Sequence, residues 1–549
     1  MLQRRVSPAR RYVVRTLRIV ALVGTILIGI IALALIASQT SWFKDWLRGF
    51  AVREANQYVN GTVSVGSLGG NLLYGVQLGN VEIDMGGEQV VAIKQIEIKY
   101  SIGELIASGM TVREIRLDQP FVLLRHTAAG WNLAQLVKRQ QQEANRTGPS
   151  KPLSLPNLEI VDGRAVIDDR APSPSYRLPK EIDAVNVNAG YQYEPVHYSL
   201  TLNRVNFAAK TPDLSLQQLS GRLGERNDDI NIQKLTVKTP QSSVTIDGDV
   251  RNYSSSPAVQ LTLSAPALSM PEFSGVLPSL HGYDLHPSLD LKASGPENAL
   301  QLTVHEKSEA GAVDGALTAD VAAPGYGARG AINVRDLNLA PVLNSPADTS
   351  DITGHVAMNL RMAASPANAP ALDRVNGRVS VDAPLVAAAG YRATDVKLTA
   401  DLAGRRVTID GRAAAYGGTA TATGLVVAPA ASGQALQFDL TGSASHLNLA
   451  NLPRTLKAPR AATNINVASY HAAGTIGSRT NMSGGATLGR STVPGATVLN
   501  GTAAQFAMSS TKAGLQSLAY SAHGGVRHLN AETLGHALQI ASIATPNYA

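Results

Sequence analysis

The chain has 549 residues, no cysteine and a formal net charge of +7. The lack of cysteine excludes disulfides, thiolate metal ligands and thiol nucleophiles. Charged residues make up 16% of the chain, below the usual quarter. Six arginines within residues 1–18 nearly account for the net charge, so the remainder is close to neutral and nucleic acid is not expected as a partner.

The basic segment 1–18 precedes nineteen uncharged, mostly aliphatic residues, Ile19 to Ala37. This length fits the hydrocarbon core of a bilayer and predicts a transmembrane helix over 19–37. The flanking arginines predict that residues 1–18 stay in the cytoplasm and that residues 38–549 are exported to the periplasm. A cleavable signal peptide is the alternative, with a weak site at Ala34, Ala37 and Ser38, but its apolar core is usually shorter. The sequence therefore favours an uncleaved, single-pass anchor in the inner membrane.

An aromatic-rich segment follows the predicted anchor. From Ser41 to Asn60, one helical face carries the apolar residues Trp42, Phe43, Trp46, Leu47 and Phe50. Such a pattern predicts a juxtamembrane amphipathic helix over residues 38–60. A simple continuation of the anchor helix is the alternative.

From Thr62 onward the hydrophobic period changes to two, which is typical of strands with one apolar and one polar face. The clearest apolar positions are Val244, Ile246, Leu261, Leu263, Val396, Leu398, Leu436 and Phe438. The polar positions between them include Thr245, Thr262, Lys397 and Asp439. We expect the first set to line one apolar face and the second set to face water. Alternation alone favours the alternative, two sheets packed face to face as a sandwich.

Irregularities divide this β-rich chain. Near Lys94 and Gln95 the apolar positions change from odd to even numbers, which predicts a β-bulge. A single helix is expected over 131–143, and the Pro- and Gly-containing segment 146–152 predicts a linker between the regions 61–145 and 153–549. The segments 263–273, 332–343 and 440–453 form a degenerate repeat, each with a strand, a Leu-Asn-Leu-like element and a Leu and Pro break.

Four segments follow one another in a recognisable order: "GSLGGNLLYGVQLGNVEID" (66–84), "GELIASGMTVREIRLDQPFVLLR" (103–125), "GWNLAQL" (130–136) and "LEIVDGRAVIDD" (158–169). In this order they resemble the AsmA-like family, particularly its TamB branch. Together they cover about 130 residues and are specific as a set, although no single motif is. TamB proteins are typically longer and end in a characteristic C-terminal domain that this sequence lacks, so a shortened homologue, a truncated product or a fragment is expected.

The resemblance implies a mainly β fold, in which an elongated, curled, open sheet forms an apolar groove after the transmembrane helix. It implies an inner-membrane-anchored bridge in the cell envelope that carries phospholipid towards the outer membrane and supports outer-membrane biogenesis. The alternative is a scaffold of a translocation and assembly module, with an outer-membrane β-barrel protein as partner and a role in protein secretion. On this interpretation the eight apolar positions are lipid-groove candidates.

Catalytic and metal-binding patterns are weak in this sequence. It has no H-E-x-x-H, Walker or G-x-S-x-G motif. A possible metal cluster is formed by His281, Asp284 and His286, which lie close together in the sequence. No further ligand follows at a suitable spacing, so a turn is the better interpretation. We therefore expect no enzyme activity, no cofactor and no metal.

Overall fold

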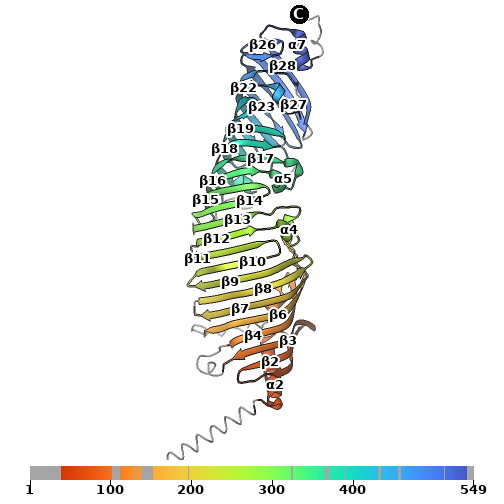
Figure 1. Cartoon of the computed structure of the whole chain (residues 1–549), viewed down its shortest axis with the longest axis vertical. Coiled ribbons are helices and arrows are strands. Elements are labelled where there is room, and N and C mark those ends of the chain that lie inside the picture. The colour runs from red at the N-terminus through yellow and green to blue at the C-terminus, as the bar shows by residue number, and fades with distance from the viewer. Residues whose placement is uncertain are drawn as a thin grey trace, which may run out of the picture. The chain divides into compact units, whose positions relative to one another are not determined.

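A computed structural model describes residues 37–540, except 38, 102–111, 129, 137, 139–151, 196, 323–324, 365–369, 389, 431–433, 455–458 and 512–513. The chain divides into two compact units, which we describe separately. Unit 1 comprises 1–241 and 272–281, and unit 2 comprises 242–271 and 282–549. The protein is mainly β, with a main open sheet of 26 strands, ten of them in unit 1 and sixteen in unit 2 (Figure 1).

The first helix described, α2 (Ser41–Tyr58), covers most of the segment predicted as helix. The Thr40 hydroxyl caps it by accepting a hydrogen bond from the backbone N–H of Phe43 at 3.4 Å. No helix in the described part of the chain is both long and apolar enough to cross a membrane. Of the predicted span 19–37, only Ala37 lies within the described residues. The anchor therefore stays a prediction.

Unit 1 contains a sheet in which each strand pairs antiparallel with the next, with one exception. Its strands are β1 (Thr62–Gly69), β2 (Gly75–Met85), β3 (Glu88–Tyr100), β4 (Val112–Thr127), β5 (Gly130–Trp131), β6 (Leu153–Asp169), β7 (Glu181–Glu194), β8 (His197–Lys210), β9 (Leu214–Arg226) and β10 (Asp229–Lys238). The exception is the parallel pairing of β4 with β6, which flank the predicted linker 146–152. Of that linker only Pro152 is described. The compact units divide at Gln241 rather than at the linker, because the chain returns to the same sheet after it.

The helix predicted over 131–143 is much shorter within the described residues. Trp131 belongs to β5, and only a 3-10 turn, η1 (Asn132–Gln135), follows. The Asn132 side chain accepts a hydrogen bond from the Arg125 backbone N–H and donates one to the Leu123 carbonyl, so this segment is fixed to β4.

The irregularity predicted near Lys94 is present but is not a simple bulge. Ile93 pairs with Val81 and Ile96 pairs with Leu78, so the register does not shift as an inserted residue would require. At the equivalent position, neighbouring strands contain a residue with positive φ, such as Gln119 with 49°. The apolar side chains therefore change from one face of the sheet to the other at the same position in each of these strands.

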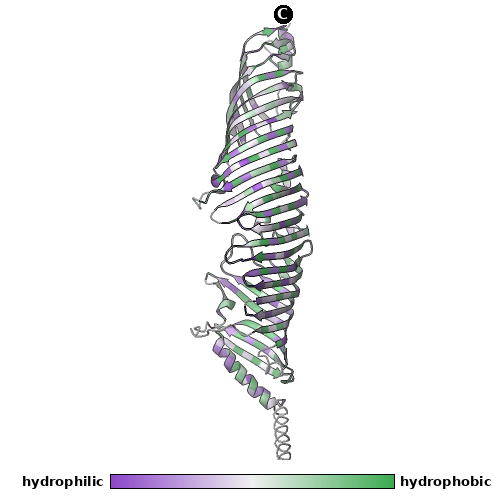
Figure 2. Ribbon diagram, turned by 90° about the vertical axis from the view of Figure 1, so that its left-hand side faces the viewer, coloured by the Kyte–Doolittle hydropathy of each residue, from purple (hydrophilic) through white to green (hydrophobic). Residues whose placement is uncertain are grey.

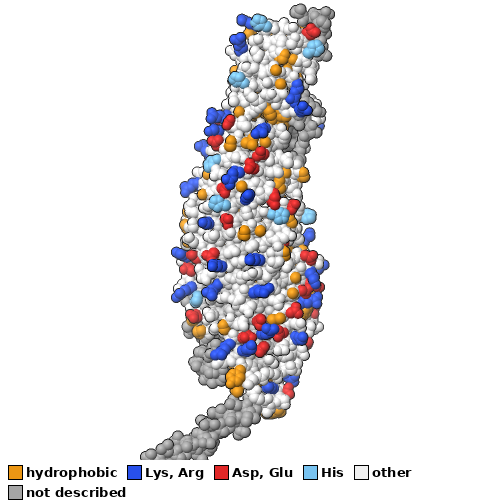
Figure 3. Space-filling view, viewed as in Figure 1, with side chains coloured by type: hydrophobic (Ala, Val, Ile, Leu, Met, Phe, Trp, Pro, Cys, Tyr) orange, Lys and Arg blue, Asp and Glu red, His pale blue; other side chains and the backbone are white. Residues whose placement is uncertain are grey.

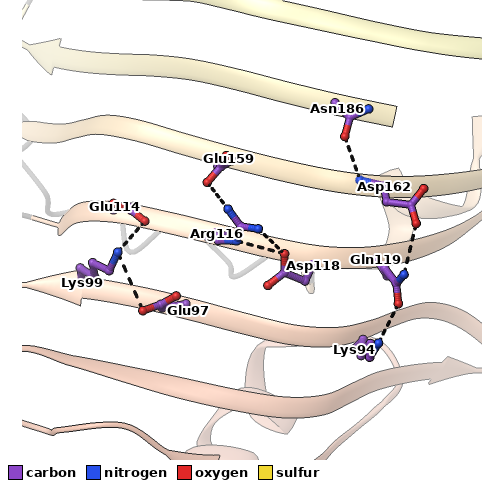
Figure 4. Close-up of polar contacts among 10 residues, drawn as sticks. All are labelled: Lys94, Glu97, Lys99, Glu114, Arg116, Asp118, Gln119, Glu159, Asp162 and Asn186. Carbon is purple, nitrogen blue, oxygen red and sulfur yellow. Dashed lines mark hydrogen bonds and ion pairs between the residues drawn. The ribbon is translucent and has the colours of Figure 1, made fainter. Parts of the chain in front are cut away.

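Polar side chains connect the strands along this line of unit 1, as Figure 4 shows. Lys94 donates to Gln119, Gln119 donates to Asp162, and the Asp162 backbone N–H donates to Asn186, at 3.0 to 3.2 Å. Beside this line Arg116 forms ion pairs with Glu159 at 2.7 Å and with Asp118 at 3.0 Å.

Unit 2 contains sixteen strands of the main sheet, each paired antiparallel with its neighbour in chain order except that β24 pairs with β27. They are β11 (Ser243–Arg251), β12 (Ala258–Ala267), β13 (Ser288–Pro296), β14 (Leu300–Ser308), β15 (Gly311–Asp320), β16 (Tyr326–Leu337), β17 (Ser350–Met362), β18 (Val375–Ala388), β19 (Tyr391–Ala403), β20 (Arg406–Ala415), β21 (Gly418–Val427), β22 (Leu436–Leu447), β23 (Ile465–Ile476), β24 (Arg479–Leu488), β27 (Thr502–Thr511) and β28 (Gly514–His523). A small second sheet joins β25 (Ser491–Val493), β26 (Ala496–Val498) and β29 (Val526–Arg527).

Short helices occupy the longer connections. They are η2 (Pro278–Leu280) in unit 1, α4 (Met270–Phe273) at the division between the units, and α5 (Leu339–Val342), η3 (Pro346–Asp348), α6 (Ala371–Arg374), η4 (Leu449–Asn451) and α7 (Ala531–Leu538) in unit 2.

The degenerate repeat of the sequence forms the same local structure twice in unit 2. The Asn338 side chain accepts hydrogen bonds from the Ala340 and Ser350 backbone N–H groups, at 3.1 and 3.2 Å. Asn448 accepts from Ala450 and Thr463 at the same distances. Each asparagine thus caps a short helix and ties it to the start of the next strand.

Candidate functional site: the apolar face of the unit 2 sheet

One face of the unit 2 sheet carries three rows of apolar residues and glycines, which we call the apolar face. Residues directly opposite one another in a β-ladder lie on the same face, so the register of each pair extends a row by one strand. Row A is Ile246, Leu263, Leu291, Val304, Gly315, Ile332, Val356, Val381, Leu398, Gly411, Ala422, Gly442, Tyr470, Ala486, Ala504 and Ala522. The row crosses all sixteen strands without a charged residue.

Two further rows run beside row A, two and four residues away along the strands. Row B is Gly248, Leu261, Ala293, Leu302, Leu317, Gly330, Met358, Val379, Ala400, Ile409, Gly424, Leu440, Ala472, Gly484, Phe506 and Tyr520. Row C runs from β14 as Leu300, Ala319, Ala328, Leu360, Gly377, Leu402, Val407, Val426, Phe438, Gly474, Met482, Met508 and Leu518. Figure 2 shows the resulting alternation of hydrophobic and hydrophilic residues along the strands.

All eight lipid-groove candidates lie on this face. Five are members of the rows: Ile246, Leu261, Leu263, Leu398 and Phe438. The other three, Val244, Val396 and Leu436, each precede a member of a row by two residues in the same strand. Every one of the eight is half-buried. Their role in binding lipid stays a prediction.

The opposite face is polar and carries both signs of charge. Of the predicted water-facing residues, Thr262, Lys397 and Asp439 are exposed and Thr245 is half-buried. Lys397 pairs with Asp382 at 3.1 Å, and Asp439 contacts the imidazole of His471 at 2.7 Å. Figure 3 shows positive and negative side chains interspersed over the visible face.

A histidine and an arginine hold one carboxylate of this polar face in its charged form. Asp314 lies between His305, which contacts it at 2.9 Å, and Arg335. The hydrogen bond from His305, together with the charge of Arg335, lowers the pKa of Asp314 below its usual range.

Among the described residues, no second sheet packs against the apolar face as it would in a sandwich. Each of the sixteen strands continues one sheet, and the small sheet of β25, β26 and β29 supplies only eight residues. A closed core buries its large side chains completely. Among the described residues the buried apolar side chains are mostly Ala and Val, with Leu285 as the largest, and they include no Ile, Phe or Met. The sandwich alternative therefore does not fit unit 2.

Glycines make room on the apolar face for large neighbours. A Cβ on Gly411 would lie 3.0 Å from Cδ1 of Leu398, so the leucine packs over the glycine opposite it. The hydroxyl oxygen of Tyr470 would lie 2.8 Å from a Cβ on Gly442, and this hydroxyl donates to the Thr421 carbonyl at 2.8 Å. Burial raises the pKa of the Tyr470 phenol.

Metal-binding chemistry is not apparent in the described part of the chain. No group of three or more His, Cys, Asp and Glu side chains there is arranged to hold a metal ion. Of the weak cluster noted in the sequence, His286 contacts Glu309 at 3.1 Å instead. The surface hollows in this part of the chain are shallow and mixed in polarity, such as the one lined by Met358, Arg378 and Asp401.

Sequence reasoning named only four of the sixteen strands that form the apolar face. Leu302, Ile332 and Met358 occupy equivalent positions, and local alternation such as Leu300-Gln-Leu-Thr-Val304 was available to find them. A further copy of the capped repeat was also missed. It lies at His528-Leu-Asn-Ala531, where Asn530 caps α7 by accepting from the Thr533 N–H at 2.9 Å.

Comparison with known proteins found no matching family model, and no curated protein or solved structure matched the chain significantly. The function must therefore be argued from the residues and the fold.

Proposed function

We propose that this protein is an inner-membrane-anchored, periplasmic bridge that carries phospholipid along the apolar face, from the inner towards the outer membrane, and so supports outer-membrane biogenesis. The observation that carries the proposal is that rows A and B stay apolar across all sixteen strands, with no covering layer among the described residues. The resemblance to the TamB branch of AsmA-like proteins agrees with it, and on that basis the sheet curls into a groove.

The dimensions of the face suit acyl chains. Sixteen strands spaced by about 4.8 Å extend the rows over about 70 Å, and rows A and C lie about 13 Å apart along the strands. One leaflet of a bilayer core is about 15 Å thick, so the length of one acyl chain is close to the width of the face between rows A and C. Each methylene that leaves water for such a surface contributes about 0.8 kcal/mol. A lipid tail can therefore remain covered while it moves through water.

The surface of α2 in unit 1 supports attachment to a membrane. Two of its basic residues point to the sheet, since Lys44 donates to the Gly70 carbonyl at 2.8 Å and Arg48 donates to the Gly66 carbonyl. Trp42, Trp46 and Phe50 are instead exposed, with Trp42 at 74%. Aromatic side chains of this kind are typical of the membrane–water interface. We infer that this face of α2 lies at the periplasmic surface of the inner membrane.

Site-specific photo-crosslinking tests the lipid proposal. A photoreactive residue at Leu263 or Phe438 should capture phospholipid in cells, whereas one at Thr262 or Gln437 should not. Each control residue neighbours its test residue in the sequence and lies on the polar face, so expression and position are matched. Equal capture at both members of a pair, or none at either, would refute the proposal.

A scaffold for outer-membrane protein assembly is the second candidate, with a β-barrel protein as partner. It is favoured by β28, which among the described strands pairs only with β27. Its other edge can therefore receive a strand from a partner. Crosslinkers along β28 that capture an outer-membrane protein, together with lipid-free apolar rows, would favour this candidate over the carrier.

A further inference from the structure

At one edge of the apolar face lies an arginine that has no carboxylate partner among the described residues. Arg374 ends the short helix α6, which connects β17 to β18. Its Nη2 group donates to the sulfur of Met362 at 2.8 Å, and its Nη1 group reaches the Ala364 carbonyl only at 3.5 Å. Met362 follows row C on the same face and pairs with Val375. The guanidinium thus lies against the apolar face rather than the polar one.

The surroundings of Arg374 leave its charge uncompensated. Within the described residues it forms no ion pair, and its Nε–H is buried without a hydrogen-bond acceptor. A methionine sulfur is only a weak acceptor. Burying an arginine N–H without a partner is unfavourable, and the penalty is larger for a charged group. An anion beside the other N–H groups of the guanidinium would compensate its charge.

A neighbouring ion pair fixes the position of α6 and adds no net negative charge. Arg405, in the turn between β19 and β20, donates through Nε and Nη2 to both carboxylate oxygens of Asp373. This interaction lowers the pKa of Asp373. The Nη1 group of Arg405 is also buried without an acceptor. Two guanidinium groups and one carboxylate leave one positive charge at this edge.

We propose that Arg374 binds the phosphate of a lipid headgroup whose acyl chains lie on the apolar face. This inference rests on the proposed function and extends it to the headgroup. Gly377 of row C lies three residues from Arg374, about 10 Å along an extended strand. A lipid anchored there would have its phosphate at the edge, next to water, and its chains over rows C, B and A. A guanidinium suits this task because its N–H groups match phosphate oxygens in pairs.

Binding of three probes to the purified full chain in non-ionic detergent tests the proposal. The probes are pyrene-labelled phosphatidylglycerol, diacylglycerol with the same labelled chains, and glycerol 3-phosphate. The wild type should bind phosphatidylglycerol about tenfold more tightly than diacylglycerol, since a charge-assisted hydrogen bond contributes at least this much. Arg374→Gln should lose this preference and keep its affinity for diacylglycerol. Arg361→Gln is the matched control, because Arg361 precedes Met362 on β17 and lies on the polar face; it should bind as the wild type does.

A second measurement covers the case in which Arg374→Gln does not fold. Phenylglyoxal modification of the wild type, mapped by mass spectrometry, should be slowed at Arg374 by phosphatidylglycerol and not by diacylglycerol. The proposal is overturned if the variant keeps the tenfold preference, or if both lipids protect Arg374 equally. Protection by glycerol 3-phosphate as strong as that by the lipid would instead assign the site to free anions. Failure of the wild type to bind either lipid would refute the carrier function itself.

Discussion

Replacing Leu398 by aspartate and by alanine separates an open apolar face from a closed core. Leu398 is half-buried in row A, between Val381 and Gly411. Full burial of a leucine is worth about 1.5 to 3 kcal/mol, so at this half-buried position either substitution should lower the local free energy of unfolding by about 1 kcal/mol. On an open face the carboxylate keeps its water, and aspartate should differ from alanine only by its poorer strand propensity, below about 1 kcal/mol. In a closed core the unpaired carboxylate would add several kcal/mol.

The same pair of variants should differ strongly in lipid binding. A hydrated carboxylate keeps two or three methylenes of a passing chain away from the wall. At about 0.8 kcal/mol each, this weakens binding by about 2 kcal/mol, or about thirtyfold. Alanine keeps the wall apolar and should change binding far less.

Native-state hydrogen exchange of the β19 amides measures the local stability, and the pyrene-lipid assay measures binding. Ser380→Asp is the matched control, because Ser380 lies on the polar face of β18, next to the residue that pairs with Leu398. It should leave both measurements unchanged. Our reasoning is refuted if Leu398→Asp is several kcal/mol less stable than Leu398→Ala, or if it binds lipid like the wild type.

Three further predictions rest on the structure and a fourth on the sequence. Gly424→Ala should cost about 2 kcal/mol of stability in denaturant unfolding, since φ is +150° and the new Cβ would lie 2.1 Å from the Asp439 carbonyl oxygen. Gly485→Ala is the control and should be close to neutral, because its Cβ would make only ordinary contacts. Asn448→Ala should remove a helix cap and cost about 1 kcal/mol, seen as faster hydrogen exchange in η4 and the start of β23. The partners of Asp314 lower its pKa in the folded protein. The stability that this group contributes is therefore complete above its ordinary pKa of about 4 and should be lost as the pH falls through the lower pKa of the folded state. A melting temperature that rises on acidification below about pH 4 would contradict this. Alkaline phosphatase fused after residue 150 should be active and a cytoplasmic reporter silent there, and the reverse pattern would refute the predicted topology.

The sequence alone predicts the face of each strand but not the register between strands. Alternation places Ile246 and Leu398 on apolar faces of their own strands, yet it does not show that both belong to row A. That row depends on the turns and on positions such as Asp395, whose φ of +51° accompanies a register irregularity between β19 and β20. The Arg374 site was beyond sequence reasoning for a related reason. A single arginine in a loop gives no signal until a neighbouring strand places Met362 beside it.

The arrangement of the rows also bears on how a lipid would move. A row offers an apolar residue or a glycine on every strand, so a chain displaced by one strand spacing, about 4.8 Å, exchanges one apolar contact for another. Hydrophobic contact is not directional, and its free energy depends mainly on the apolar area removed from water. On the proposed function, the face would supply an uncharged apolar path rather than a driving force. Net transport along it would depend on where lipid is supplied and removed. A fixed charge such as that of Arg374 would slow the movement of phosphate-bearing lipids and leave other lipids unaffected.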